Sequence, residues 1–369
     1  MRIDGIHLTH VQIPLVEPFR ISNGEVAEKD GIIVAVQSEG LTGYGESSPM
    51  AGTFYSSDTP ESCWKQLHRA LGPQISGREF ESLDAACEWL DEQPGSNFAK
   101  AGLETALWDI EAQRRGLPLH KLLGGERDRV ASGLAVGLYD ETSALLNAIA
   151  RYQKDGYQRV KIKITHGHDV ELVQAVRDEF GDIPLMTDAN AAYTIEDLLV
   201  FQRLEDFGLM MYEQPLGGRM LMESAELQRQ IATPVCLDES LESLDDVQEG
   251  VNCGAFHIAN IKIQRVGGFR NALKMYELCN KLDLSIWIGT MPELGIGQAQ
   301  GAALASLAGC DYPTDVEASS RWFCDDIIEP WIDVRDGWIA MPQTPGLGYR
   351  IDEKRLARYR VAEAEINLH

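Results

Sequence analysis

The sequence predicts an α/β fold: a parallel barrel of alternating strands and helices beside an α+β domain. Three observations predict it. Charged residues close successive strand-like runs at a nearly constant interval, helix-like stretches separate those runs, and a block of strand patterns precedes them. A repeat of about 25 residues, with one strand and one helix, is the period that a parallel barrel requires. The 369 residues are enough for such a barrel and a second domain.

The first part of the chain predicts the α+β domain, which we place at residues 1–125. Residues 1 to about 50 contain three strand-like runs separated by Gly and Asn-Gly turn signals, so we expect an antiparallel meander. From Pro60 to about Gly116 the apolar residues recur at three- and four-residue steps, as in NFAKAGLETALWDIEAQRRG, which indicates helices.

We expect the barrel at residues 126–318. Its first strand begins near Arg129 with VASGLAVGL, and seven further strands are predicted at 158–164, 183–188, 209–213, 234–238, 255–262, 283–288 and 312–316. The last unit is irregular. Residues 319–369 contain the turn-rich TPGLGY and a basic-acidic stretch that indicates a helix. We expect this tail to return to the first domain.

Five charged residues end consecutive predicted strands, at intervals of 25, 25, 25 and 24 residues: Lys163, Asp188, Glu213, Asp238 and Lys262. Right-handed crossovers place all the strand ends on one face of the barrel, so these side chains should converge. Alternation along the strand puts Lys161 on the same face as Lys163. Any single acidic residue after a strand is more often a helix N-cap or a solvated loop residue. Lysines on both sides of three such residues favour a site.

The chemistry of this set follows from its parts. Three carboxylates from adjacent strands form a hard, oxygen-only site that suits Mg²⁺, with Mn²⁺ as a substitute. A cation there stabilises the charge that develops when a proton α to a bound carboxylate is removed. The lysines on either side would then serve as acid and base. We expect the cation and the second ammonium to lower the pKa of Lys163 or Lys262.

At these positions the chain resembles the enolase superfamily, in which a lysine base commonly acts with Mg²⁺. The resemblance is to the muconate-lactonizing subgroup, and within it to o-succinylbenzoate synthases and N-succinylamino acid racemases. It covers nearly the whole chain, and its motifs are KIK at 161–163, DAN at 188–190, EQP at 213–215, DES at 238–240 and KIQRVGG at 262–268. The resemblance implies a modified TIM barrel of the (β/α)7β type, with the α+β domain as its cap.

The resemblance also implies roles for individual residues. The expected metal ligands are Asp188, Glu213 and Asp238, the expected catalytic residues are Lys163 and Lys262, and the expected supporting residues are Lys161, Asn190 and Glu239. In a synthase, Lys163 would remove the α-proton and act as the acid in a syn elimination, while Lys262 stabilises the enediolate. In a racemase, both lysines would exchange the proton.

Two loops of the first domain are candidates for substrate binding. They hold Phe19, Ser22 and Tyr55, and the resemblance implies that they close over the substrate, although such loops are otherwise ordinary surface connections. Arg265, directly after Lys262, is a candidate for a substrate carboxylate. Its neighbouring glycines serve a tight turn. The resemblance places Glu293 on the loop that lines the carboxylate end of the substrate.

Two alternatives stay open. A muconate-type cycloisomerase, or another enzyme of the superfamily acting on acid sugars or amino-acid derivatives, would share both lysines and all three carboxylates. An inactive barrel acting as a binding protein is the other alternative, although the filled charged positions argue against it. Mandelate-racemase relatives use a His/Asp pair on later strands, and IWIGTMPE contains no histidine.

The composition of the chain limits the classes of binding partner that we expect. A net charge of −24 argues against nucleic acid and anionic membranes as partners, and it says little about the substrate. The small-molecule carboxylate that we expect as the partner comes from the chemistry of the five charged residues. The seven cysteines form no C-x-x-C pair, which is typical of reduced thiols. With no long apolar run in the sequence, we expect a cytoplasmic protein. The resemblance implies a homo-oligomer.

Overall fold

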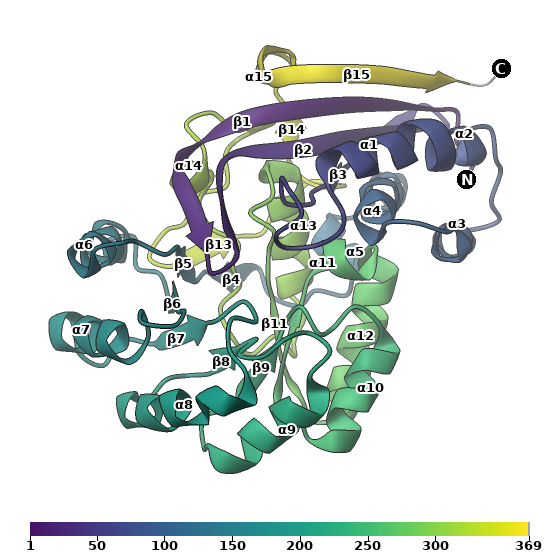
Figure 1. Cartoon of the computed structure of the whole chain (residues 1–369). Coiled ribbons are helices and arrows are strands. Elements are labelled where there is room, and N and C mark those ends of the chain that lie inside the picture. The colour runs from purple at the N-terminus through teal and green to yellow at the C-terminus, as the bar shows by residue number, and fades with distance from the viewer. Residues whose placement is uncertain (368–369) are drawn as a thin grey trace.

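The computed structural model of the chain describes residues 1–367 and confirms the predicted fold class. A parallel seven-stranded sheet, in the order β11-β10-β9-β8-β7-β6-β5, curls into the barrel. A four-stranded antiparallel sheet, in the order β15-β1-β2-β3, lies across its mouth as the cap. Figure 1 shows helices α6 to α10 and α12 around the outside of the barrel and the cap sheet above it.

The cap begins with the predicted meander of β1 (Gly5–Ile21), β2 (Gly24–Ser38) and β3 (Leu41–Ser47). Helix α4 (Asn97–Arg115) packs directly on β3, where Gly43 and Gly45 leave room for it. A Cβ at Gly45 would stand 2.0 Å from the carbonyl oxygen of Gly102. The other cap helices are α1 (Pro60–Gln66), the π-helical η1 (Leu67–Leu71), α2 (Gly72–Ile75), α3 (Leu83–Glu92) and α5 (Leu119–Leu122).

In the barrel, strands and helices alternate as the repeat predicts. The strands are β5 (Leu134–Val136), β6 (Val160–Lys163), β7 (Leu185–Asp188), β8 (Tyr212–Glu213), β9 (Val235–Leu237), β10 (Ile258–Ile261) and β11 (Ser285–Ile288). The helices are α6 (Thr142–Gln153), α7 (Val170–Phe180), α8 (Leu198–Leu204) between the 3₁₀ turns η2 (Ile195–Asp197) and η3 (Glu205–Phe207), α9 (Leu221–Gln230), α10 (Leu244–Cys253), α11 (Ile263–Val266), α12 (Phe269–Lys281) and α13 (Gly295–Ala305).

Two predicted barrel strands need correction. The run from Arg129 is divided at Gly133, where the guanidinium of Arg159 occupies the space of a side chain. Its first part, β4 (Arg129–Ala131), pairs with β13 (Trp338–Ala340), and only β5 enters the barrel. The segment 312–316 forms no regular strand. Pro313 has no N–H to donate, and one isolated bridge joins Thr314 to Ser132, just before β5. Cys310, just before the segment, is bridged to Ile286 of β11, so this stretch lies between the two edge strands of the sheet.

The C-terminal part returns to the cap. After α14 (Ser319–Trp322), β12 (Ile328–Glu329), β13, β14 (Arg350–Ile351) and α15 (Glu353–Tyr359), strand β15 (Arg360–Asn367) pairs with β1. The helix predicted for the tail therefore ends at Tyr359, and a strand follows it. The division of the chain at residues 125 and 318 stays a prediction. Within residues 1–367, no helix has the length and apolar character needed to cross a bilayer.

The interior of the barrel is filled below its mouth. Trp287 packs there with Met186, Met211, Cys236 and Ile258, and its Nε1–H lies 3.2 Å from the Sγ of Cys236. This packing fills the lower part of the barrel, where the guanidinium of Arg159 lies 4.8 Å from the ring centroid of Trp287.

Candidate active site

The five charged residues converge as the strand order requires. In the register, Lys163 stands beside Asp188, and Asp188 stands beside Glu213. Asp238 follows β9, and Lys262 follows β10. Because β7, β8 and β9 lie between β6 and β10 in the sheet, the carboxylates come from strands that separate the two lysines.

Each carboxylate is buried and paired with a cation. Lys163 Nζ donates to Asp188 at 2.5 Å, and Lys262 Nζ donates to Asp238 at 2.9 Å. One oxygen of Glu213 accepts a hydrogen bond from Asn260 at 2.8 Å. Its other oxygen lies 3.2 Å from the ammonium of Lys161 without a hydrogen bond.

Burial and mutual repulsion dominate the electrostatics of the carboxylates. Burial, with repulsion from Asp188, raises the pKa of Glu213 to about 8. Burial, with repulsion from Asp238, raises the pKa of Glu239 to about 7. Burial alone would also raise the pKa of Asp238, but Arg265 and Lys262 outweigh it and hold that pKa below its usual range.

The pKa of Lys262 is shifted in the direction opposite to the one expected from the sequence. Burial alone would lower the pKa of Lys262, but the charge of Asp238 outweighs it and raises the pKa. Burial would likewise lower the pKa of Lys161, and Asp315 with Glu213 raises it instead. At Lys262 and Lys161 the pKa is therefore raised, because a carboxylate is turned directly to each ammonium.

The donor set fits a divalent cation chemically. Asp188, Glu213 and Asp238 supply hard oxygen ligands, Glu213 keeps one buried oxygen without a hydrogen bond, and the raised pKa of Glu213 reports crowded negative charge. In the structure these carboxylates are turned toward ammonium and guanidinium groups. In this arrangement, residues 1–367 contain no group of three acidic, His or Cys side chains disposed as a complete metal site.

The supporting residues lie where the strands turn into loops. Asn190 has a positive φ of 43°, uncommon outside glycine, and its Nδ2 donates to Glu239 at 2.9 Å. Gln214 has a φ of 36°, and its side-chain oxygen accepts the backbone N–H of Asp238 at 2.9 Å. These bonds tie together the loops that follow β7, β8 and β9.

Asp315 is a site residue that sequence reasoning missed. Its carboxylate accepts Lys161 Nζ at 2.5 Å and Arg159 at 2.6 Å, and it lies at the cavity floor. The signal was available, because Asp315 stands in the segment predicted as the last strand. The regular interval between charged strand ends stops at Lys262, so the repeat itself does not point to Asp315.

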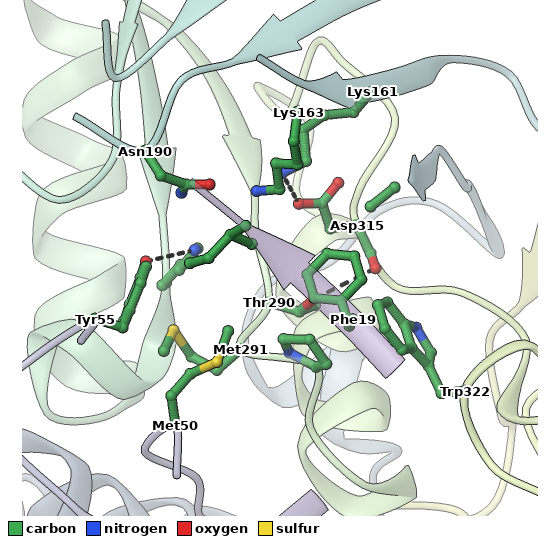
Figure 2. Close-up of a pocket in the computed structure, with 14 residues that line it drawn as sticks. Phe19, Met50, Tyr55, Lys161, Lys163, Asn190, Thr290, Met291, Asp315 and Trp322 are labelled. Carbon is green, nitrogen blue, oxygen red and sulfur yellow. Dashed lines mark hydrogen bonds and ion pairs between the residues drawn. The ribbon is translucent and has the colours of Figure 1, made fainter. Parts of the chain in front are cut away.

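A small cavity opens between these groups and the cap. Figure 2 shows Lys161 and Lys163 at one side of it, Tyr55 at another, and Phe19 beside Trp322. The predicted residues that line it are Phe19, Tyr55, Lys161, Lys163, Asn190 and Lys262. Sequence reasoning did not name the others, which are largely apolar: Ile21, Met50, Ala135, Thr290, Met291, Pro292, Asp315 and Trp322.

Three predicted binding residues lie outside the cavity wall. Ser22 donates to the carbonyl of Ala189 at 3.1 Å, which ties its loop to the end of β7. Arg265 is bound to Asp238 and to the hydroxyl of Tyr55, and it does not line the cavity.

Glu293 is the third residue outside the wall. It is buried near Lys29 and Glu46. Burial, countered by Lys29, raises the pKa of Glu293.

Comparisons with known proteins identify the family of the chain. The family model described as "Mandelate racemase / muconate lactonizing enzyme, N-terminal domain" matches residues 4–124, and "Enolase C-terminal domain-like" matches residues 144–355. An o-succinylbenzoate synthase of Bacillus subtilis is 41% identical over 97% of each chain. An N-succinylamino acid racemase of an Amycolatopsis species is 38% identical over 94% of this chain and 95% of its own.

Solved structures show the same architecture. The crystal structure of an enolase-superfamily member from Listeria innocua has a TM-score of 0.94, with 34% identity, and covers 100% of this chain and 99% of its own. Enzymes of the mandelate racemase and muconate lactonizing enzyme family generally depend on a divalent metal. Matched along both domains by family models and by relatives of similar length, the chain belongs to the mandelate racemase and muconate lactonizing enzyme family of the enolase superfamily.

Proposed function

We propose that the protein removes the proton α to a substrate carboxylate with the help of Mg²⁺, and that this step leads to o-succinylbenzoate by syn-dehydration, to racemised N-succinylamino acids, or to both. The observation that carries the proposal is that Lys163 and Lys262 line one cavity, while the strands between theirs supply three buried carboxylates. Relatives named for each of the two reactions support it.

The roles of the residues follow from their positions. Asp188, Glu213 and Asp238 would hold the cation, which neutralises charge that builds on the substrate carboxylate. Lys163 takes the α-proton with its neutral amine. In dehydration the same group returns a proton to the departing β-hydroxyl on that face, while Lys262 stays an ammonium. In racemisation Lys262 delivers a proton to the opposite face.

The residues around Lys163 and Lys262 suit proton transfer to and from a bound carboxylate substrate. Lys161 lies within 4 Å of Asp188, Glu213 and Asp315, so it keeps a positive charge near the carboxylates. Phe19, Met50 and Trp322 exclude water from the other half of the cavity. An apolar half beside a charged half suits a substrate with a carboxylate at its reacting end and a less polar body.

The test is isotope exchange in D₂O. With N-succinylamino acids as substrates, α-deuterium should appear in the wild-type reaction and fall by at least about a hundredfold in Lys163→Ala and Lys262→Ala. Lys281→Ala, at an exposed position of α12, is the matched control and should exchange like the wild type. Dehydration is followed separately with the β-hydroxy acid precursor of o-succinylbenzoate. Undiminished exchange in either active-site variant would remove that lysine from the mechanism.

A further inference from the structure

The hairpin of β1 and β2 contains a break just before it reaches the barrel. The two strands pair without interruption from Gly5 to Pro14, lose register, and pair again from Phe19. In Figure 1, β1 bends away from the cap sheet toward the barrel over its last part. Such irregularities bend a strand and re-aim its side chains. The tip that carries Phe19 is therefore joined to the cap through residues 15–18.

Arg321 of α14 contacts this break. Its side chain is 3% exposed, and one terminal nitrogen lies 3.3 Å from Oε1 of Glu17, inside the break. The other terminal nitrogen donates to the carbonyl of Ala135 on β5 at 3.2 Å. A single guanidinium thus joins the break in β1 to the first strand of the barrel.

Glu317 fixes the other side of the guanidinium. It is fully buried, its Oε2 lies 3.5 Å from Nε of Arg321, and its Oε1 accepts the N–H of Ala135 at 2.9 Å. The guanidinium carbon also lies 4.5 Å from the ring centroid of Tyr152 and 4.9 Å from that of Trp322. Backbone and rings together hold Arg321 in one place.

The link from Arg321 to the cavity has two routes. Glu17 precedes Phe19 by two residues, and the ring of Trp322 packs edge-on against Phe19 at 5.0 Å between centroids. The Phe19 ring in turn lies 5.8 Å from the ammonium of Lys163. A displacement of the guanidinium would therefore move Phe19 in two ways, through the backbone from Glu17 and through the ring of Trp322.

The geometry of the ion pairs indicates that they fix positions and add little to stability. Glu17 Oε1, Glu317 Oε2 and Arg321 Nε make no hydrogen bond, although they are buried. A buried ion pair without aligned hydrogen bonds recovers little of its desolvation cost and so adds little to stability. It still fixes the relative positions of the segments that it joins.

We propose that Arg321 is a positioning residue: with Glu17 and Glu317 it clamps the break in β1 and sets where Phe19 stands over the cavity. The inference rests on the proposed function, in which this cavity receives the substrate. Arg321 itself does not touch the reacting atoms.

The first test is Glu17→Gln, which removes a charge from the partly exposed end of the clamp. KM for an N-succinylamino acid should rise about tenfold with kcat within about twofold, because a displaced binding group weakens substrate positioning. Cleavage by trypsin after Arg20, at the hairpin tip, should become faster. Arg151→Gln is the matched control, since exposed Arg151 pairs with the same carboxylate at 3.4 Å. It should leave KM and cleavage unchanged.

The second test replaces the guanidinium. Arg321→Met should reproduce both effects, and Arg321→Lys, which keeps the charge without the fork, should fall between it and the wild type. If Arg321→Met does not fold, Glu17→Gln decides alone. Unchanged KM and unchanged cleavage in Glu17→Gln, or an equal change in Arg151→Gln, would overturn the clamp. If the wild type turns over neither substrate, the proposed function fails, and the trypsin result still decides on the clamp.

Discussion

At the scale of single residues, the site is a set of buried carboxylates, each of which is paired with a lysine or arginine side chain. Asp238 illustrates this, because Lys262, Arg265 and the hydroxyl of Tyr55 all converge on it. Its pKa is low although burial opposes ionisation, so the carboxylate stays charged at neutral pH, as its proposed role as a metal ligand requires.

Asp238→Asn should separate metal binding from folding. The substitution keeps the shape and removes the charge, so the Mg²⁺ concentration for half-maximal activity should rise by at least about tenfold. Calorimetric titration of Mg²⁺ should show the same weakening. Asp245→Asn, at an exposed position of α10, serves as the control. Kinetics and titration curves identical to the wild type would contradict the assignment of Asp238 as a ligand.

At the scale of elements, close packing between α4 and β3 gives the cap its shape. A Cβ at Gly43 would stand 2.2 Å from the carbonyl oxygen of Ala106, and one at Gly45 would meet that of Gly102 at 2.0 Å. Backbone cannot move aside as a flexible side chain can, so these two positions require glycine because of the helix that lies on them.

Gly45→Ala should therefore destabilise the cap. The methyl group would separate α4 from β3, at a cost of about 2–3 kcal/mol in the free energy of unfolding measured with urea. Gly5→Ala on β1 is the comparison, since the nearest atom to its methyl would be a side-chain oxygen of Asn367, at 3.2 Å, and the nearest backbone atom would be 3.6 Å away. If both variants lost equal stability, the contact with α4 would not be the cause.

At the scale of the whole molecule, carboxylates of the cap hold the first turns of barrel helices. Glu46 accepts the backbone N–H groups of Leu294 and Gly297 at the start of α13, and Glu104 accepts those of Phe269 and Arg270 at the start of α12. A helix N-terminus favours a negative charge. Burial nevertheless raises the pKa of both Glu46 and Glu104 to about 7.

These raised values predict how stability depends on pH. A carboxyl whose pKa is higher in the folded state binds its proton more tightly there, so its contribution is complete below about pH 4.5 and is lost as the pH rises through 7. Between pH 6 and pH 8, Glu104 should account for a loss of about 1.4 kcal/mol.

Urea unfolding at the two pH values tests this contribution. Glu104→Gln should show a smaller loss between pH 6 and pH 8 than the wild type, and Glu277→Gln, at an exposed position of α12, should show the same loss as the wild type. An unchanged slope in Glu104→Gln would contradict the prediction.

The sequence by itself determined the order of the barrel and the arrangement of the charged strand ends. A constant interval between strands is a local property of the chain. Because parallel strands are joined by right-handed crossovers, this interval is enough to place consecutive strands side by side in the sheet. For the same reason Lys163, the three carboxylates and Lys262 appear in the site in their order along the sequence.

Only the tertiary structure decided which side chains line the cavity. Arg265 turns to Asp238, Glu293 lies near Lys29, and Asp315 joins the floor from a segment that forms no regular strand. These directions depend on ion-pair partners that lie far away in the sequence, such as Lys161 and Asp315, which are 154 positions apart. Local periodicity carries no signal about partners at such a distance, because packing and charge choose them only after the chain has folded.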